Sequence, residues 1–385
     1  MFETLHPATP EELRDHLAGA AKAKRSIEVF GANTKRLMAG PRAPASVQIS
    51  TSHLNRIVQY EPRDLTIGVE AGMPFAALSR ELARHGQMVP LDGAWSDEST
   101  VGGMIAANIS GYRRRLYGTA RDLVIGMKFA TLDGKLVQSG GMVVKNVAGL
   151  DMAKLLIGSF GTLAAIATVN FKLVPIPAAA RTLLFSFDDL KAAMAARDAA
   201  LRGVLNPAAA DLLNPILAAQ FNLKGFVLAL LFTGNQAVIE RSNREAEKLG
   251  AARALTPEED QKFWHAVTHV TPRHLDKFKE GAVVRVSTTL SECAEALATV
   301  EGPGHAHAAS GIVRAWFAHP EPAARWLKGA VKRGWKGVIE YSAESAKADL
   351  GLWPDPGGDF AIMKRIKHMF DPEGLLNSGR LYGLL

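Results

Sequence analysis

The chain has 385 residues, of which 48% are hydrophobic and 22% charged, and its net charge is +7. This length is too great for a single hydrophobic core and predicts two or three domains of an ordinary globular protein. The basic residues alternate with acidic ones along the chain, and only Arg113 to Arg115 form a tight run. That distribution argues against nucleic-acid binding and favours an anionic ligand or an acidic protein partner.

The single cysteine, Cys293, excludes an internal disulfide and an iron–sulfur cluster held by this chain alone, because a cluster needs several thiolates. We expect it to be a buried, inert thiol. Residues 1–7 lack the basic and apolar regions of a signal peptide. The longest apolar run, Gly225 to Phe232, is far below the ~20 residues that cross a bilayer, and it predicts a buried strand. We therefore expect a cytosolic protein that could still contact membrane-bound partners peripherally.

The first 177 residues have the pattern of a glycine-rich mixed domain. A helix is expected to begin at Pro10, with Thr9 as its N-cap and Glu12 at the capping-box spacing. A second helix is expected from Pro74 to His85, with its apolar residues on one face. Strands rich in β-branched residues are predicted at residues 26–30, 47–50, 57–60, 65–70, 123–131, 136–138 and 163–174.

The stretch from Pro175 to Ala180 is a predicted linker, after which the glycine density falls. Strands at residues 183–187, 226–232 and 283–287 are expected to alternate with helices at 190–201 and 237–249, which indicates an antiparallel sheet backed by helices. A further helix is expected to begin at Asp359, followed by a turn-rich tail. The predicted organisation is a first domain at 1–177, a second at 178–358 and a C-terminal segment at 359–385.

Two glycine-rich stretches suit a large anionic ligand. Gly31 to Lys35 follows a predicted strand, and small residues there can turn backbone N–H groups toward a pyrophosphate, although a plain turn would have the same composition. The stretch from Thr100 to Gly118 contains paired glycines that permit close backbone approach and alanines that leave a helix surface flat. No Rossmann G-x-G-x-x-G sequence occurs in the chain.

Four motifs in order resemble those of the vanillyl-alcohol oxidase/p-cresol methylhydroxylase flavoprotein superfamily. They are the stretch Thr100–Gly118, the block Gly140–Asp151 with Lys145-Asn146, the segment Gly158–Leu163, and the tail Phe370–Leu381. The last three resemble the branch that contains the glycolate oxidase flavin subunits and D-lactate dehydrogenases. The shorter second domain and the Lys145-Asn146 block are most similar to the smaller flavin-domain subunit of bacterial glycolate oxidase. This resemblance implies an α+β fold: a two-subdomain PCMH-type FAD-binding domain followed by an α+β cap domain with an antiparallel sheet.

The resemblance also implies which residues bind FAD. The Gly31 loop would hold the pyrophosphate, the Thr100 stretch would line the flavin and its diphosphate arm, and the segment after Gly161 would lie beside the adenine-ribose end. The tail would return to the first domain. The Gly31 loop contains no histidine to link a flavin, so we expect FAD to be noncovalent. The expected cofactor-binding residues are Gly31, Ala32, Asn33, Thr34, Lys35, Thr100, Gly102, Gly103, Ala106, Asn108, Gly111, Gly118, Gly161, Thr162, Ile166, Asn377 and Arg380.

Oxidation of a 2-hydroxy acid requires a base for the hydroxyl proton and a cation for the carboxylate, while the flavin accepts the hydride. Arg285 lies on a predicted strand and could clamp the carboxylate, but an exposed arginine at a strand edge would have the same pattern. His305 and His307 lie two residues apart, so on a strand they would point to one face. They are candidates for proton transfer, for a shared metal or for a structural role; our preferred assignment includes no metal.

Two functions stay open from the sequence. In the first, the chain oxidises glycolate, D-lactate or a relative as the flavin-binding subunit of a glycolate oxidase complex. In the second, it is a non-catalytic FAD-bearing subunit for electron transfer or assembly, and a partner carries out the substrate chemistry. Leu150 and Ser378 depart from the tyrosine and proline of the resembled motifs, which weakens the transfer of active-site detail. Because the chain lacks cluster-ligating cysteines, electrons must leave to a quinone, a dye or an iron–sulfur partner. The resemblance implies a second flavin subunit and an iron–sulfur subunit as partners. A binding module that has lost its flavin is the third alternative.

Overall fold

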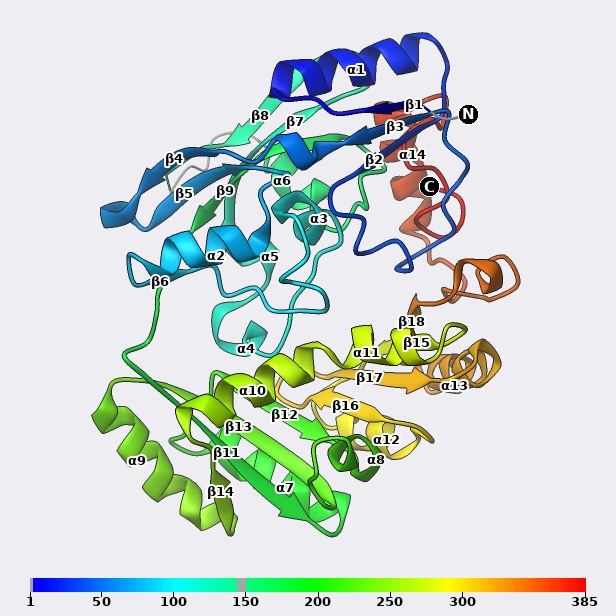
Figure 1. The fold of residues 1–385 in the computed structure, drawn as a ribbon. Helices are drawn as coiled ribbons and strands as arrows, with labels where there is room; N and C mark the ends of the chain where they lie inside the picture. The colour runs from blue at the N-terminus through cyan, green and yellow to red at the C-terminus, as the bar shows by residue number, and fades with distance from the viewer. Residues whose placement is uncertain (1–2, 144–149) are drawn as a thin grey trace.

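The computed structural model describes residues 3–143 and 150–385, which form two parts (Figure 1). The chain up to residue 178 and the C-terminal helix build the upper part, and the segment from β11 (Ala179–Phe187) to β18 (Lys336–Tyr341) builds the lower part. The expected α+β architecture is confirmed. No helix among the described residues has the length and the apolar composition needed to cross a membrane.

The first sheet of the upper part has three parallel strands in the order β1-β3-β2. Helix α1 (Pro10–Lys22) begins as predicted, because the Thr9 side chain accepts a hydrogen bond from Glu12 N. The Glu12 carboxylate accepts from Ala8 N, one residue before the N-cap. The strands are β1 (Glu3–Leu5), β2 (Ile27–Phe30) and β3 (Val47–Ser50).

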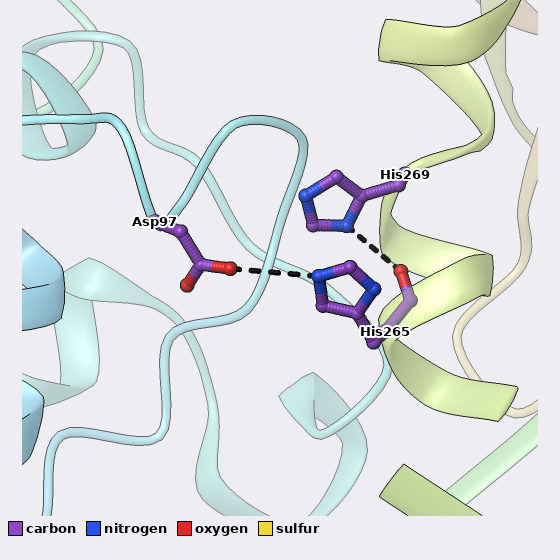
Figure 2. Close-up of side chains that lie close together, drawn as sticks. All are labelled: Asp97, His265 and His269. Atoms are coloured by element: carbon purple, nitrogen blue, oxygen red, sulfur yellow. Dashed lines mark hydrogen bonds and ion pairs between the residues drawn. The ribbon is translucent and has the colours of Figure 1, made fainter. Parts of the chain in front are cut away.

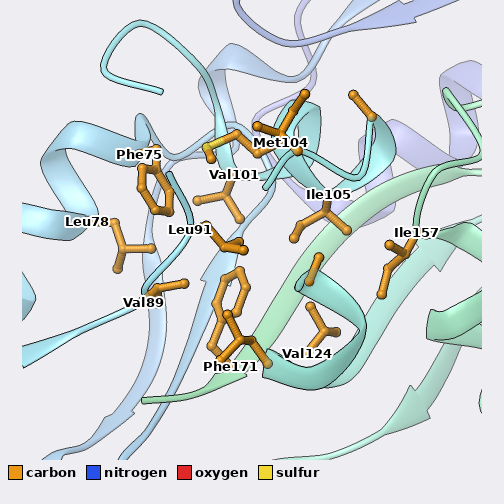
Figure 3. Packing of buried hydrophobic residues seen from close by; sticks show 14 of the residues in the cluster. Phe75, Leu78, Val89, Leu91, Val101, Met104, Ile105, Val124, Ile157 and Phe171 are labelled. Carbon is orange, nitrogen blue, oxygen red and sulfur yellow. The ribbon is translucent and has the colours of Figure 1, made fainter. Parts of the chain in front are cut away.

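The second sheet has five antiparallel strands in the order β4-β5-β9-β7-β8. Helix α2 (Phe75–Ala83) buries Phe75, Leu78 and Leu82, the apolar face that the sequence predicts. Figure 3 shows two of these side chains in one cluster with Phe171 of the sheet and Met104 of α3 (Val101–Ala106). Hydrophobic packing therefore fixes α3 on this sheet. The strands are β4 (Ile57–Glu61), β5 (Thr66–Glu70), β7 (Val124–Ala130), β8 (Leu136–Gly140) and β9 (Ala165–Lys172).

Short elements complete the upper part. The two-stranded sheet of β6 (Gln87–Met88) and β10 (Val174–Pro175) closes the region just before the lower part begins. The small helices are α4 (Arg114–Tyr117), α5 (Ala120–Leu123) and α6 (Met152–Leu156). The C-terminal helix α14 (Phe360–Phe370) returns to the upper part, where Lys367 Nζ donates to Thr162 O at 2.8 Å (Figure 1). Beyond it, Leu376 forms a β-bridge with Ile27, so the end of the chain contacts the beginning of β2.

The lower part contains one antiparallel sheet of eight strands in the order β14-β11-β13-β12-β16-β17-β15-β18. Predicted strands correspond to β11, β13 and β15. The sequence patterns did not predict the other five, of which β12 and β16 lie at the centre. The strands not yet given are β12 (Ala209–Leu213), β13 (Phe226–Gly234), β14 (Ala252–Ala254), β15 (Ala282–Ser287), β16 (Gly304–His307) and β17 (Ile312–Phe317).

Helices cover both faces of this sheet. Alternate residues of β11 belong to different cores: Leu183 and Phe185 pack with α7, α9, α12 and α13, whereas Leu184 packs with α10, α11 and the upper part. Cys293 of α12 is buried, and burial raises the pKa of its thiol to about 11, as expected for an inert cysteine. The helices are α7 (Leu190–Arg202), α8 (Pro215–Ala219), α9 (Gln236–Ala246), α10 (Pro257–Thr268), α11 (Val270–Lys277), α12 (Cys293–Ala298) and α13 (Pro320–Lys332).

Candidate functional site

A cavity in the upper part collects most of the expected cofactor-binding residues, and we call it the cradle. The loop Gly31–Lys35 leaves β2 along one side, the start of α3 forms the second side, and the C-terminal tail closes the third. The expected residues that line the cradle are Gly31, Ala32, Asn33, Thr34, Lys35, Thr100, Gly103, Ala106, Asn377 and Arg380. Three segments far apart in the sequence therefore meet at one site.

The loop has room for its path only because residue 31 is a glycine. A Cβ atom at Gly31 would lie 2.1 Å from Thr100 Oγ1. Asn33 adopts φ 56°, a left-handed conformation that asparagine tolerates better than most residues. Within the described part of the chain, the backbone N–H groups of Ala32, Asn33 and Thr34 have no hydrogen-bond acceptor. Such adjacent free N–H groups suit the oxygens of a phosphate chain.

Lys35 fixes the end of this loop. Its Nζ atom donates to Ala94 O at 2.8 Å and to Ser99 Oγ at 2.7 Å, so the amine is fully engaged although it is buried. Burial lowers the pKa of Lys35 to about 7. An anion in the cradle would favour the protonated form of Lys35, and Lys35 therefore adds a cation that responds to the ligand.

Helix α3 presents its first turn to the cradle. The Thr100 side chain caps the helix by accepting from Gly103 N at 3.2 Å. A Cβ atom at Gly103 would meet only Thr100 Oγ1 within 4 Å, so the space beyond it is the cradle itself. Ala106, one turn further, keeps the same surface flat. Free N–H groups on one side and a side-chain-free helix surface on the other fit a long, partly anionic cofactor such as FAD.

The tail residues hold the cradle together. The Asn377 side chain accepts from Val29 N at 2.8 Å and donates to Phe160 O at 2.9 Å, which joins β2 to the turn after α6. Arg380 donates to Met38 O at 2.7 Å and to Gly40 O at 3.0 Å. Both residues line the cradle, but these bonds show that they also shape it.

Seven expected residues lie elsewhere. Asn108 and Gly111 line the neighbouring cavity described below. A Cβ atom at Gly102 would lie 2.8 Å from Ala71 Cβ, so this glycine packs α3 onto the sheet and faces away from the cradle. Gly118 and Gly161 occupy left-handed turns, Thr162 donates to Ser159 O, and Ile166 is buried in β9. The structure does not bring these last five to the cradle. The Lys145-Asn146 block lies outside the described residues.

Two adjoining hollows lie between the segment after α3 and the sheet of the lower part, and together we call them the polar cavity. They share Asn108, Ser110, Arg314 and Glu340. The polar cavity shares Ala107 and Phe160 with the regions around the cradle, so the two are adjacent. Its polar residues come from one face of the lower sheet because strand residues alternate between faces. They are Arg285, His305, His307, Arg314 and Glu340, with Asn108, Ser110 and Arg114 on the opposite side.

His305 and His307 point to the same face of β16, as the sequence predicts, and share one carboxylate. His305 Nε2 lies 2.9 Å from Asp211 Oδ2, and His307 Nδ1 lies 3.0 Å from Asp211 Oδ1. All three side chains are buried. Burial opposes ionisation of Asp211, but the attraction and hydrogen bonds of His307 and His305 hold the pKa of this carboxyl below its ordinary value. Asp211 is therefore an ionised acceptor for both rings.

Arg314 determines which ring nitrogen of His307 carries the proton. Its Nη1 atom lies 3.1 Å from His307 Nε2, and a guanidinium can only donate. His307 Nε2 must therefore accept, and Nδ1–H donates to Asp211. Burial lowers the pKa of His307 to about 4, in agreement with a neutral ring. His305 differs, because the described residues offer no partner to its Nδ1 atom.

Arginine side chains gather around Glu340. The buried Glu340 carboxylate lies 2.8 Å from Arg314 Nε and 3.3 Å from Arg285 Nε. Burial opposes ionisation of Glu340, but the two arginines hold its pKa below the ordinary value. Burial lowers the pKa of Arg114, and the nearby charges of Arg314 and Arg285 lower it further. Three guanidinium groups thus face one cavity with one carboxylate between them, which leaves excess positive charge for an anion.

Sequence reasoning missed four of these polar residues: Arg114, Asp211, Arg314 and Glu340. Arg114 belonged to the basic run Arg113 to Arg115, which was the one available signal. The strands that carry Asp211, Arg314 and Glu340 were not predicted, and none of the three residues belongs to a recognisable motif. The order β12-β16-β17-β15-β18 brings them together.

Comparisons with known proteins agree with this geometry. A family model for the FAD binding domain matches residues 4–140, and a model for the C-terminal domain of FAD linked oxidases matches residues 353–381. The chain is 26% identical over 383 residues to glycolate oxidase subunit GlcE of Escherichia coli (strain K12), which covers 97% of this chain and 98% of that relative. It is 31% identical over 205 residues to glycolate oxidase subunit GlcD of Bacillus subtilis (strain 168), or 52% of this chain and 44% of that relative.

The fold is also that of a solved enzyme structure. The structure of p-cresol methylhydroxylase with substrate bound superposes with a TM-score of 0.77, covering 99% of this chain and 88% of the other at 16% identity. The two family models confirm the expected cofactor as FAD. The chain is an FAD-dependent oxidoreductase that combines the FAD binding domain with the C-terminal domain of the FAD linked oxidases, and it is a homologue of the glycolate oxidase subunit GlcE.

Proposed function

We propose that the chain oxidises a small 2-hydroxy acid, such as glycolate or D-lactate, to the 2-oxo acid as the flavin-binding subunit of a glycolate oxidase complex. The observation that carries this proposal is the polar cavity beside the cradle, where Arg114, Arg285 and Arg314 face a single buried carboxylate of Glu340. Guanidinium groups bind carboxylates in a two-pronged geometry, so this cavity suits the carboxylate of a small acid.

The oxidation removes a proton from the substrate hydroxyl group and a hydride from the adjacent carbon. When bound, FAD accepts the hydride. We assign Arg285 and Arg114 to the carboxylate, because Arg314 is already bonded to both Glu340 and His307. We assign the hydroxyl proton to His305 at Nδ1, with Asp211 holding the opposite side of the ring and stabilising the imidazolium that forms.

We propose that FAD is bound noncovalently, since no histidine is among the described residues that line the cradle. The chain has one cysteine, so the electrons would leave to a partner that carries its own redox group or to a quinone. We therefore propose a second flavin subunit and an iron–sulfur subunit as partners. The similar protein GlcE of Escherichia coli is a subunit of glycolate oxidase, which supports an assembly of this kind.

A second candidate, a non-catalytic FAD-bearing subunit, is favoured by one observation. The two histidines are buried and bonded to Asp211, and Arg314 takes the remaining nitrogen of His307. Only His305 Nδ1 then remains for chemistry. In this case the same network would be a structural device that holds β12, β16 and β17 together.

Anaerobic titration of the purified yellow chain with glycolate or D-lactate separates the candidates. Bleaching of the flavin absorption by the chain alone supports the oxidation. Bleaching that requires a partner, and that survives a His305→Gln substitution in this chain, supports the non-catalytic subunit. A purified chain that is colourless and takes up no added FAD would defeat both.

A further inference from the structure

A side-chain cluster at the boundary of the two parts lies outside the flavin site. Asp97 belongs to the loop that precedes α3, and His265 and His269 lie one turn apart at the end of α10 (Figure 2). One potential ligand atom from each of the three side chains lies within 4.8 Å of the other two. We propose that this cluster binds a divalent transition-metal ion of the zinc class and that the ion links the loop at residues 93–99 to α10.

The donor types and their spacing suit such an ion. Two histidines four residues apart on a helix share one face, an arrangement that recurs in zinc sites, and a carboxylate oxygen is a common third ligand. His265 Nε2 lies 3.7 Å from Asp97 Oδ2. This is too long for a hydrogen bond but close to the roughly 3.4 Å between two ligand atoms of a tetrahedral ion with bonds of about 2.0–2.1 Å.

The second histidine is already oriented for coordination. His269 Nδ1 lies 2.8 Å from His265 O, so Nδ1–H donates and Nε2 keeps a lone pair. A metal-bound histidine characteristically donates its other N–H to such a carbonyl. The rings of His265 and His269 lie close together, with centroids 3.9 Å apart.

Both sides of the cluster are held in place by other contacts. On α10, the neighbouring Trp264 donates to Thr182 Oγ1 at 2.7 Å and stacks on Tyr112 with centroids 4.2 Å apart. On the loop, Ser96 N donates to Gly93 O at 3.1 Å, and Ala94 O accepts from Lys35 of the cradle. Little ordering is then needed to bind an ion, because the elements that carry the ligands are fixed beforehand.

The position of the cluster gives the ion a role beyond the redox reaction. Asp97 belongs to the upper part and both histidines to the lower part, so coordination would join the two. The same loop holds Lys35 through Ala94, and the link would therefore stabilise one wall of the cradle. This inference does not depend on which acid the enzyme oxidises.

The test is a titration of Zn²⁺ into the full, FAD-loaded chain in competition with a chromogenic chelator. We expect one site in the wild type that weakens by at least about 10-fold in Asp97→Asn and in His269→Gln, because even outer-shell partners of a metal contribute about 10–100-fold to affinity. The control is His368→Gln, an exposed histidine of α14, which should bind Zn²⁺ like the wild type. Equal binding by wild type and His269→Gln would overturn the site.

Hydrogen exchange tests the link separately. Zn²⁺ should slow exchange at residues 93–99 in the wild type and leave it unchanged in His269→Gln. If Zn²⁺ binds but exchange of this loop does not respond, or if Asp97→Asn keeps full affinity, the ion does not connect the two parts and the proposal fails. Asp97 is exposed and His269 is half-buried, so the Tm of either variant without Zn²⁺ should stay close to that of the wild type.

Discussion

Arg314 Nη1 lies 3.1 Å from His307 Nε2, and this contact separates the roles of two histidines that look equivalent in the sequence. A guanidinium cannot accept a hydrogen bond, so His307 is engaged at both ring nitrogens. Among the residues that the structure describes, the His305 ring has one hydrogen-bond partner, Asp211, and its Nδ1 atom has none. We therefore assign His305 to the proton and His307 to positioning.

Substitution of the two histidines should have different effects. His305→Gln should lower the rate of flavin reduction by about 10²–10⁴-fold, the usual contribution of a general base. His307→Gln should leave Arg314 and Asp211 incompletely bonded and lower the free energy of unfolding by about 1–3 kcal/mol. Its effect on the pH dependence of flavin reduction should be small. Stopped-flow reduction and thermal unfolding of both variants check this, and equal kinetic losses would contradict the division of roles.

Arg285 should act through binding of the substrate carboxylate. Arg285→Met should raise KM for glycolate or D-lactate by roughly 10-fold or more, since a hydrogen bond to a charged group contributes about 1.5–3 kcal/mol. FAD content should not change, because Arg285 does not line the cradle. Arg325→Met, on helix α13, is a matched control. An unchanged KM in Arg285→Met would contradict the assignment of Arg285 to the substrate carboxylate.

Substitutions of the two adjacent glycines of α3 should have different effects. Gly103→Val would place its side chain in the cradle and should abolish FAD uptake with little change in Tm. Gly102→Val would meet Ala71 and should lower Tm, because overpacking typically costs about 1–3 kcal/mol. Gly19→Ala, where nothing lies within 4 Å, is the control. Stoichiometric FAD binding by Gly103→Val would contradict the assignment of α3 to the FAD-binding surface.

The buried His307 should make stability depend on pH. Burial lowers its pKa to about 4, whereas the unfolded ring titrates near 6.5. Between these values the unfolded chain binds a proton that the folded chain does not, so stability should fall as pH decreases from about 6.5 to about 4. Burial also lowers the pKa of His274 and adds to the same trend. The difference in pH slope between wild type and His307→Gln isolates one residue, and identical slopes would contradict a neutral His307.

The upper part could be predicted closely because its strands are rich in β-branched residues and its glycines occur in motifs. The lower sheet could be predicted only in part. β12 has the sequence Ala-Ala-Asp-Leu-Leu, whose residues favour helices, and it forms a strand because β13 and β16 pair with it on both sides. β16 has only four residues, which is too short for a periodic signal.

The sequence predicted which residues belong to the candidate site better than it predicted the contacts between them. The two-residue spacing of His305 and His307 was enough to place both on one face. Nothing in the sequence pairs either with Asp211, because that contact depends on the antiparallel register of β12 and β16 across 94 residues. For the glycines, the sequence predicted a surface that permits close backbone approach, with Gly102 and Gly103 both at the cofactor. Only the packing separates Gly103, which lines the cradle, from Gly102, which packs on the sheet.

The most direct test of the central claim is anaerobic stopped-flow reduction of the bound flavin by glycolate and by D-lactate, comparing wild type with His305→Gln. If the polar cavity is the substrate site, at least one acid should reduce the wild-type flavin, and the variant should bind FAD normally but be reduced at least about 100-fold more slowly. Equal rates of reduction in the two proteins would contradict the account.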